Sequence, residues 1–420
     1  MKKYILKKYM PWHTFFLLVL VALSIQGCLG IGGNSSTSNQ NFKSVNTSNG
    51  RTLQVNTSNS ALFNGKIYFT QNHILYFIDG SRNVHTVTPN KYAVYDPSVS
   101  PDGKWLAFIV RYKYSSDLVY MPVNSSRWKV LYTGTGKYVS NPVYPAPKST
   151  ALWYVQPAWA ADSNHLIFLS DGEKEEWYAT TQNSPMLDLQ VFSTSRLSQD
   201  PNWNTDHQHD VAYADFGDGG NRDPSYRPGP GHNHNEIIYT HYTYDKTETH
   251  QVIQLFLEDS TMITNHPAAN YHPGVAGSGY DPAVPLTPAI NDLGNMMPSW
   301  SPDGNSLAYI RRMDASHMGL YVMPVPDGLT SNPNDHGVQA KAQQPYKKSS
   351  LIVSGQYVSN PVWSPDGKQI AYLYYSNNEF DIWIGNVSVD PKTGAYTMKG
   401  NPVPLTNGGV DGDSRPFWTA

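Results

Sequence analysis

The chain has 420 residues, of which 39% are hydrophobic and 15% charged, and its formal net charge is −3. This charge gives no electrostatic attraction to nucleic acid, and 29 tyrosines and 11 tryptophans supply a large core, which excludes a disordered chain. With 32 glycines and 31 prolines, turns are frequent and long helices are not expected. The single cysteine, Cys28, excludes both an internal disulfide and a cysteine-based zinc site.

Residues 1–27 have the pattern of a lipoprotein signal peptide. Four lysines precede an apolar run from Phe15 to Ile25, which is shorter than the roughly 20 residues of a membrane-spanning helix. The run ends in Ile25-Gln26-Gly27-Cys28 and resembles the bacterial lipobox, in which a small residue precedes the cysteine that carries the lipid. We therefore expect an exported protein anchored to a membrane through lipidated Cys28. It would lie in the cell envelope: at the outer membrane or in the periplasm of a Gram-negative cell, or on the surface of a Gram-positive one.

Residues 28–59 are rich in glycine, serine, asparagine and threonine and contain few large apolar residues. This composition predicts a flexible tether between the anchor and a folded body. The folded body is expected to cover residues 60–420.

A turn motif recurs along this body at intervals of 55 to 74 residues. In Ser-Pro-Asp-Gly, proline sets φ, aspartate bonds nearby main-chain N–H groups, and glycine adopts a positive φ. The clearest copies contain Pro101, Asp102 and Gly103, then Pro302, Asp303 and Gly304, and finally Pro365, Asp366 and Gly367. Degenerate copies surround Pro157, Pro224 and Pro416.

Each copy leads into a short run that is apolar on both faces, such as residues 106–108, and further strands follow. The unit is thus four strands long, the size of a propeller blade. Residues 415–420 supply a first strand, and residues 65–88 supply the other three of the same blade. We predict an all-β, six-bladed propeller closed by pairing the C-terminal strand with N-terminal strands. The tryptophans at fixed positions in the repeat are expected to pack between blades: Trp159, Trp300, Trp363 and Trp418.

These repeats resemble the TolB-type, WD40-like propeller repeat, and the resemblance covers about residues 60–420. It implies a six-bladed propeller of the kind generally used as a binding scaffold. In TolB itself an α/β domain precedes the propeller, whereas here a short tether follows Cys28. A partner in the envelope, either a protein or a glycan, is the corresponding expectation.

Histidine is unevenly distributed, with eight of 14 between residues 207 and 272. Because loops before first strands and after second strands share one end of a propeller, four histidines are expected on one face as candidate ligands of a divalent metal ion: His207, His209, His241 and His250. The others, His232, His234, His266 and His272, would lie at the opposite end. The alternative is that long polar loops simply accumulate histidine.

No Gly-x-Ser-x-Gly, Walker or His-Glu-x-x-His motif is present. The related oligogalacturonate lyases imply an alternative function, a metal-dependent polysaccharide lyase that would use His207, Gln208, His209 and His250. The favoured interpretation is a non-catalytic module that binds a protein, peptide or glycan. Its specificity loops are expected within residues 134–155, 200–222 and 259–282, and several loop tyrosines suit a recognition surface: Tyr242, Tyr244, Tyr271 and Tyr280.

Overall fold

The computed structural model describes residues 41–48, 50–135, 137–139, 148–172, 174–175, 186–197, 209–214, 217–261, 283–331 and 340–420. All of them belong to one compact unit, Asn41–Ala420. The expected signal peptide and Cys28 lie outside the described residues. Within the described ranges, no helix is long and apolar enough to cross a membrane.

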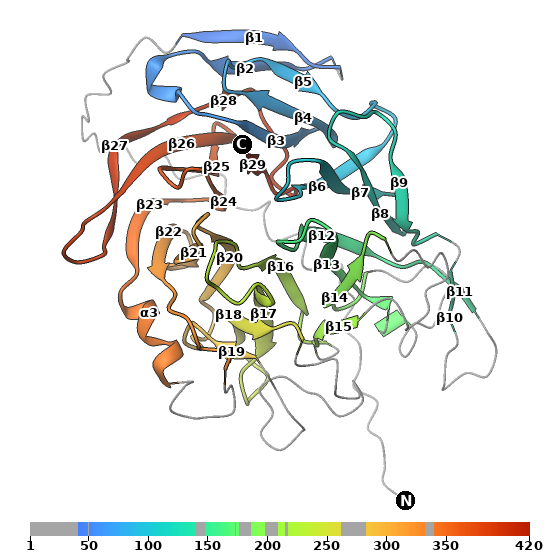
Figure 1. Cartoon of the computed structure of the whole chain (residues 1–420), viewed down its shortest axis with the longest axis vertical. Helices are drawn as coiled ribbons and strands as arrows, with labels where there is room; N and C mark the ends of the chain where they lie inside the picture. The colour runs from blue at the N-terminus through green and yellow to red at the C-terminus, as the bar shows by residue number, and fades with distance from the viewer. Residues whose placement is uncertain are drawn as a thin grey trace, which may run out of the picture. The chain divides into compact units, whose positions relative to one another are not determined.

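The described residues form six antiparallel blades, numbered here in chain order (Figure 1). Blade I consists of β29 (Phe417–Thr419), β3 (Lys66–Gln71), β4 (Ile74–Asp79) and β5 (Val84–Thr86). Blade II consists of β6 (Ala93–Val99), β7 (Trp105–Arg111), β8 (Ser116–Pro122) and β9 (Lys129–Tyr132). Blade III consists of β12 (Tyr154–Trp159), β13 (His165–Ser170), β14 (Gln190–Ser195) and β15 (His209–Ala212).

The remaining three blades follow the same order of strands. Blade IV consists of β16 (Asn221–Tyr226), β17 (Glu236–Tyr244), β18 (Gln251–Asp259) and β19 (Val284–Pro285). Blade V consists of β20 (Gly294–Trp300), β21 (Ser306–Arg312), β22 (Met318–Pro324) and β23 (Ser350–Gly355), and one parallel pair, Ile253 with Gly294, joins it to blade IV. Blade VI consists of β24 (Val358–Trp363), β25 (Gln369–Ser376), β26 (Glu379–Val389) and β27 (Tyr396–Pro404). Two short helices, η2 (Asn59–Ala61) and α3 (Gln344–Lys347), lie outside the sheets.

The blades form a closed ring. Each first strand contacts the first strands of the two neighbouring blades, in the order β6, β12, β16, β20, β24, β29 and back to β6. The last strand, β29, pairs with β3 through Phe417–Tyr68, Trp418–Ile67 and Thr419–Lys66, so blade I is built from both ends of the folded unit. The six-bladed propeller and its closure by the C-terminal strand are thereby confirmed.

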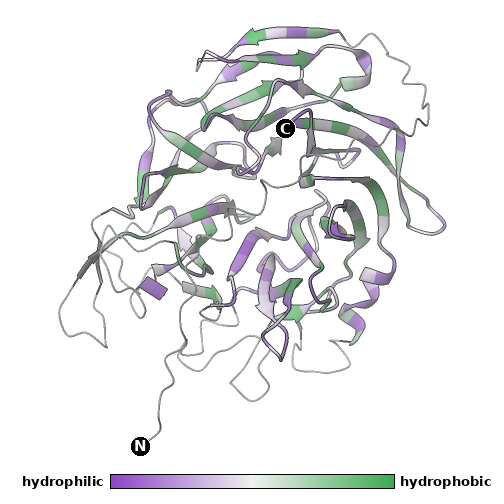
Figure 2. Cartoon of the chain, turned by 180° about the vertical axis from the view of Figure 1, so that it is seen from behind, coloured by the Kyte–Doolittle hydropathy of each residue, from purple (hydrophilic) through white to green (hydrophobic). Residues whose placement is uncertain are grey.

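The core is divided among the spaces between blades. Second strands such as β7 and β13 are buried along most of their length, and hydrophobic segments lie along the strands in Figure 2. Six buried clusters fill the six spaces, including the one between blades VI and I. The four repeat tryptophans are at most 6% exposed. Trp159 Nε1 donates to the Ser98 carbonyl of blade II at 2.9 Å, and Trp363 Nε1 donates to the equivalent Ser299 carbonyl at 3.1 Å. These tryptophans pack between blades, as predicted.

The Ser-Pro-Asp-Gly motif forms the tight turn between first and second strands. In blade II the Ser100 hydroxyl donates to Asp102 at 2.6 Å and accepts the Trp105 N–H at 2.9 Å, while Gly103 has a φ of 69°. The hydrogen bond from Ser100 lowers the pKa of Asp102. The turns of blades V and VI repeat this arrangement, so the repeat reflects shared local hydrogen bonding.

One segment differs from the sequence prediction. Part of the expected tether forms a hairpin, β1 (Phe42–Asn46) and β2 (Thr52–Asn56), and β2 pairs with β28 (Thr406–Asn407) at the outer side of blade VI. Leu53 and Val55 are fully buried in the cluster between blades VI and I. A flexible tether therefore does not extend to residue 59, because alternating apolar residues give this polar segment one buried face.

An insertion separates blades II and III. There β10 (Lys137–Val139) pairs with β11 (Lys148–Thr150), and the first strand of blade III contains Pro157.

Candidate functional site

One end of the strands, here called the loop face, carries the loops from second to third and from fourth to first strands. Four exposed tyrosines lie there, between 40% and 45% exposed: Tyr112, Tyr114, Tyr244 and Tyr357. They are all of the exposed aromatic side chains in the described ranges. The other end, the turn face, carries the Pro-Asp-Gly turns.

Near these tyrosines, an arginine is flanked by aromatic rings at the junction of blades II and III. Arg111 ends β7 and is exposed, with its guanidinium 5.3 Å from the ring centre of Tyr95 and 5.1 Å from that of Trp153. The His73 ring stacks on the same Tyr95, with 4.5 Å between the two ring centres. Arginine and aromatic side chains together supply charge, planar stacking surface and little conformational entropy, which suits recognition.

His73 also connects blade I to the loop before the closing strand. Its main-chain N–H donates to Asp411 at 2.6 Å, and its Nδ1 lies 3.3 Å from the same carboxylate. The hydrogen bond to Asp411 raises the pKa of His73. Protonation of the His73 imidazole therefore strengthens a contact between loops of the loop face, at the point where the propeller closes.

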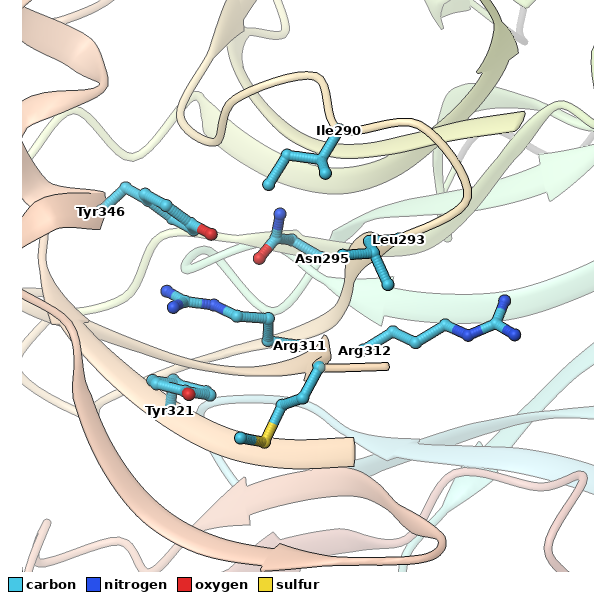
Figure 3. Close-up of a pocket in the computed structure, with 9 residues that line it drawn as sticks. Ile290, Leu293, Asn295, Arg311, Arg312, Tyr321 and Tyr346 are labelled. Atoms are coloured by element: carbon cyan, nitrogen blue, oxygen red, sulfur yellow. The ribbon is translucent and has the colours of Figure 1, made fainter. Parts of the chain in front are cut away.

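A pocket of about 240 Å³ opens at the loop-face end of blade V (Figure 3). Its centre is Arg311, the penultimate residue of β21, whose guanidinium lies 3.9 Å from the ring centre of Tyr321 and 4.1 Å from that of Tyr346. Figure 3 shows the guanidinium between these two rings, with Asn295 beside them and Arg312 directed away. Apolar side chains complete the wall: Ile290, Leu293 and Met313.

Two polar atoms of this pocket have no hydrogen-bond partner in the structure. They are Asn295 Oδ1 and Arg311 Nε, both buried. Asn295 as a whole is only 1% exposed. Leaving a buried polar atom unpaired costs about 1–3 kcal/mol. A polar ligand that hydrogen-bonds to these side chains would therefore recover part of this cost.

The candidate metal ligands are not brought together by the part of the chain that is described. His241 is buried in β17, where its Nδ1 lies 2.8 Å from Asn221 Oδ1 and its ring packs edge-on against Phe256. His250 lies in the loop after β17 and pairs with Asp292 at 2.6 Å. His209 begins β15 at the outer edge of blade III, and His207 and Gln208 lie outside the described residues. Among described side chains no group of three histidine, cysteine, aspartate or glutamate residues is placed to hold a metal ion.

His232 lies on the turn face, as the repeat predicts, and both of its ring nitrogens contact protein oxygens. It lies 2.6 Å from Asp327 and accompanies Arg227, which is 1% exposed and bonds Glu236 at 2.7 Å. Of the predicted recognition tyrosines, Tyr244 is exposed and Tyr242 is half-buried. Tyr271 and Tyr280 lie outside the described residues.

Sequence reasoning missed Arg111, Asn295 and Arg311, although a comparison of repeats contains a signal for the last. In the second strands of blades II, V and VI, an alanine pairs with the first strand, and Arg311 lies three residues after this alanine in blade V. The residues at the same position are Val110 in blade II and Tyr374 in blade VI. A cation in a column that is apolar or aromatic in those blades marks a departure from the packing pattern.

No family model and no curated protein matches the chain. Solved structures that resemble it are propellers at low identity. TolB from Acinetobacter baumannii is 15% identical over 84% of this chain and 66% of that one, with a TM-score of 0.49. A putative TolB from Agrobacterium tumefaciens is 12% identical over 84% and 93%, and an oligogalacturonate lyase in complex with manganese is 11% identical over 85% and 83%, each with a TM-score of 0.45. This chain spans just under two thirds of the length of the Acinetobacter protein.

Proposed function

We propose that the protein is an exported lipoprotein, anchored through Cys28, whose propeller binds a protein, peptide or glycan of the cell envelope through the loop face. The supporting observation is the concentration of exposed aromatic side chains at this end: Tyr112, Tyr114, Tyr244 and Tyr357. Tyrosine and arginine are enriched at recognition surfaces because they bury much area at a small cost in conformational entropy.

The binding proposal is tested by crosslinking in cells and recovery from the envelope. We expect the variant Tyr112→Ala/Tyr114→Ala/Tyr357→Ala to recover at least tenfold less crosslinked partner than the wild type. The matched control, Leu197→Ala/Leu351→Ala, removes side chains that are 70% and 47% exposed elsewhere and should leave recovery unchanged. Equal recovery with both variants would contradict binding through the loop face.

The anchor is tested separately. In the Cys28→Ser variant we expect loss of the acyl mass from the mature N-terminal peptide and movement of the protein from the membrane to the soluble fraction. Retention in the membrane fraction without the acyl mass would contradict lipid anchoring while leaving the binding proposal in place.

A further inference from the structure

The pocket on blade V offers a cation without a described counterion. Among the described residues, no carboxylate lies within 4.0 Å of Arg311, whose Nη2 donates to the Tyr309 hydroxyl and whose Nε is buried and unpaired. Both faces of its guanidinium are covered by the Tyr321 and Tyr346 rings. The side chain is thus held with its edge, rather than its faces, available to a ligand.

Guanidinium edges bind planar anions best. A carboxylate accepts two parallel hydrogen bonds from an arginine, which adds direction to the attraction between charges. Asn295 stands next to this edge in Figure 3, and its amide presents a donor to the same group when its oxygen and nitrogen are exchanged by rotation. One carboxylate against this edge therefore neutralises the Arg311 guanidinium and gives the Asn295 amide a partner.

The apolar lining and the volume of the pocket indicate which kind of molecule carries the carboxylate. Ile290, Leu293 and Met313 provide an apolar wall, which offers nothing to the hydroxyl groups of a sugar. The volume of about 240 Å³ is below the roughly 300–1,000 Å³ of sites for drug-sized ligands. It suits one amino-acid residue, and Met313, which is 39% exposed, shows that the pocket opens to solvent.

We propose that this pocket binds the C-terminal residue of a peptide or protein, with its free carboxylate on Arg311 and Asn295 and an aliphatic or aromatic side chain against Ile290, Leu293 and Met313. Capture of a chain terminus combines charge with one side-chain pocket and gives specificity from few contacts. This inference deepens the proposed function, because it assigns part of the loop face to a carboxy-terminal peptide.

The test is fluorescence anisotropy with the detergent-solubilised full-length protein. The probe is a labelled hexapeptide that ends in leucine with a free carboxylate, compared with the same peptide ending in a carboxamide and with digalacturonate as competitor. We expect the free acid to bind at least tenfold more tightly than the amide. We also expect Arg311→Gln to remove this difference. The matched control Arg127→Gln, at an exposed arginine in the loop after β8, should change affinity less than about twofold.

A measurement on the wild type makes the result independent of variant folding. The hexapeptide with photo-leucine at its C-terminus should crosslink to Ile290, Leu293 or Met313, as mapped by mass spectrometry. Equal affinity for acid and amide, displacement by digalacturonate alone, or crosslinks only to residues that do not line the pocket would overturn the inference. If the peptide fails to bind while partner recovery still depends on the loop-face tyrosines, only the pocket inference is wrong. If the peptide binds but partner recovery does not depend on these tyrosines, only the proposed function is wrong.

Discussion

Gln156 and Asp223 exchange two hydrogen bonds at the centre of the propeller. The Asp223 main-chain N–H donates to Gln156 Oε1 at 2.7 Å, and Gln156 Nε2 donates to Asp223 Oδ1 at 2.8 Å. Both residues precede the proline of their first strand and have positive φ, 54° and 55°. The strand bulges at this point, which frees a main-chain N–H that the neighbouring blade must satisfy.

The same position is used around the ring. Asp96, Met297 and Asn360 also precede the motif proline and have positive φ. The Met297 N–H donates to the Thr240 hydroxyl, which in turn donates to Asp223. The Asp96 N–H donates to Ser414, next to the closing strand. Side chains of one blade thus accept main-chain N–H groups of the next, and this inner belt of hydrogen bonds explains why a polar residue often precedes the proline.

Removing the Gln156 side chain should therefore destabilise the whole ring. Gln156→Ala leaves the buried Asp223 N–H and carboxylate short of partners, so we expect a loss of about 2 kcal/mol in the free energy of unfolding. Urea denaturation provides the measurement. Gln344→Ala, which removes an exposed amide on α3, is the control and should cost less than about 0.5 kcal/mol; equal effects would contradict a structural role for the belt.

The closing strand should be indispensable. Gly65 has a φ of 85°, and a β-carbon there would lie 2.0 Å from the Thr419 carbonyl oxygen, so Gly65→Ala forces β29 away from β3. Gly394 has a similar φ of 70° but open space around it. Both substitutions introduce the same backbone strain at a positive φ, so Gly394→Ala is the control for the clash with Thr419. We expect the unfolding midpoint to fall several degrees further for Gly65→Ala than for Gly394→Ala. Deletion of residues 414–420 should give a larger loss, and an unchanged midpoint would refute closure by this strand.

The contact between His73 and Asp411 should make closure sensitive to pH. Because the folded-state pKa of His73 is raised, its stabilising contribution is full below its ordinary value of about 6.5 and disappears as pH rises through the folded-state value. We expect His73→Gln to lower stability more at pH 5.5 than at pH 8.5, by less than about 1 kcal/mol because the pair is partly solvated. Thermal unfolding at the two pH values measures the difference, which should vanish in an Asp411→Asn background. A larger effect at pH 8.5 would show that the ring is neutral in the pair.

Metal binding separates the binding module from the alternative lyase. The buried bond between His241 and Asn221 and the pair of His250 with Asp292 engage the two candidates whose side chains the structure describes. We therefore expect added Mn²⁺ or Zn²⁺ to leave the unfolding midpoint unchanged, since a ligand that binds only the folded state would raise it. A rise that His250→Ala abolishes, together with cleavage of acidic oligosaccharides, would favour the lyase instead.

The propeller could be predicted because six copies of the first-strand motif, three of them with the full Ser-Pro-Asp-Gly turn, recur at similar spacing and support one another. The hairpin at residues 42–56 could not, since Leu53 and Val55 are isolated apolar residues in a polar segment and their burial depends on blades VI and I. The pocket was missed because Arg311 and Tyr346 come from distant segments. Only folding places the Tyr346 ring over the guanidinium.

The loop face is proposed as the surface through which the propeller binds its partner. Hydrogen–deuterium exchange of the protein with and without its crosslink-identified partner measures this directly. We expect slower exchange in residues 112–115, 245–250, 286–293, 313–317 and 356–357 when the partner is bound, and no change in the turns at 101–104, 302–305 and 365–368. Protection confined to those turns would contradict binding through the loop face.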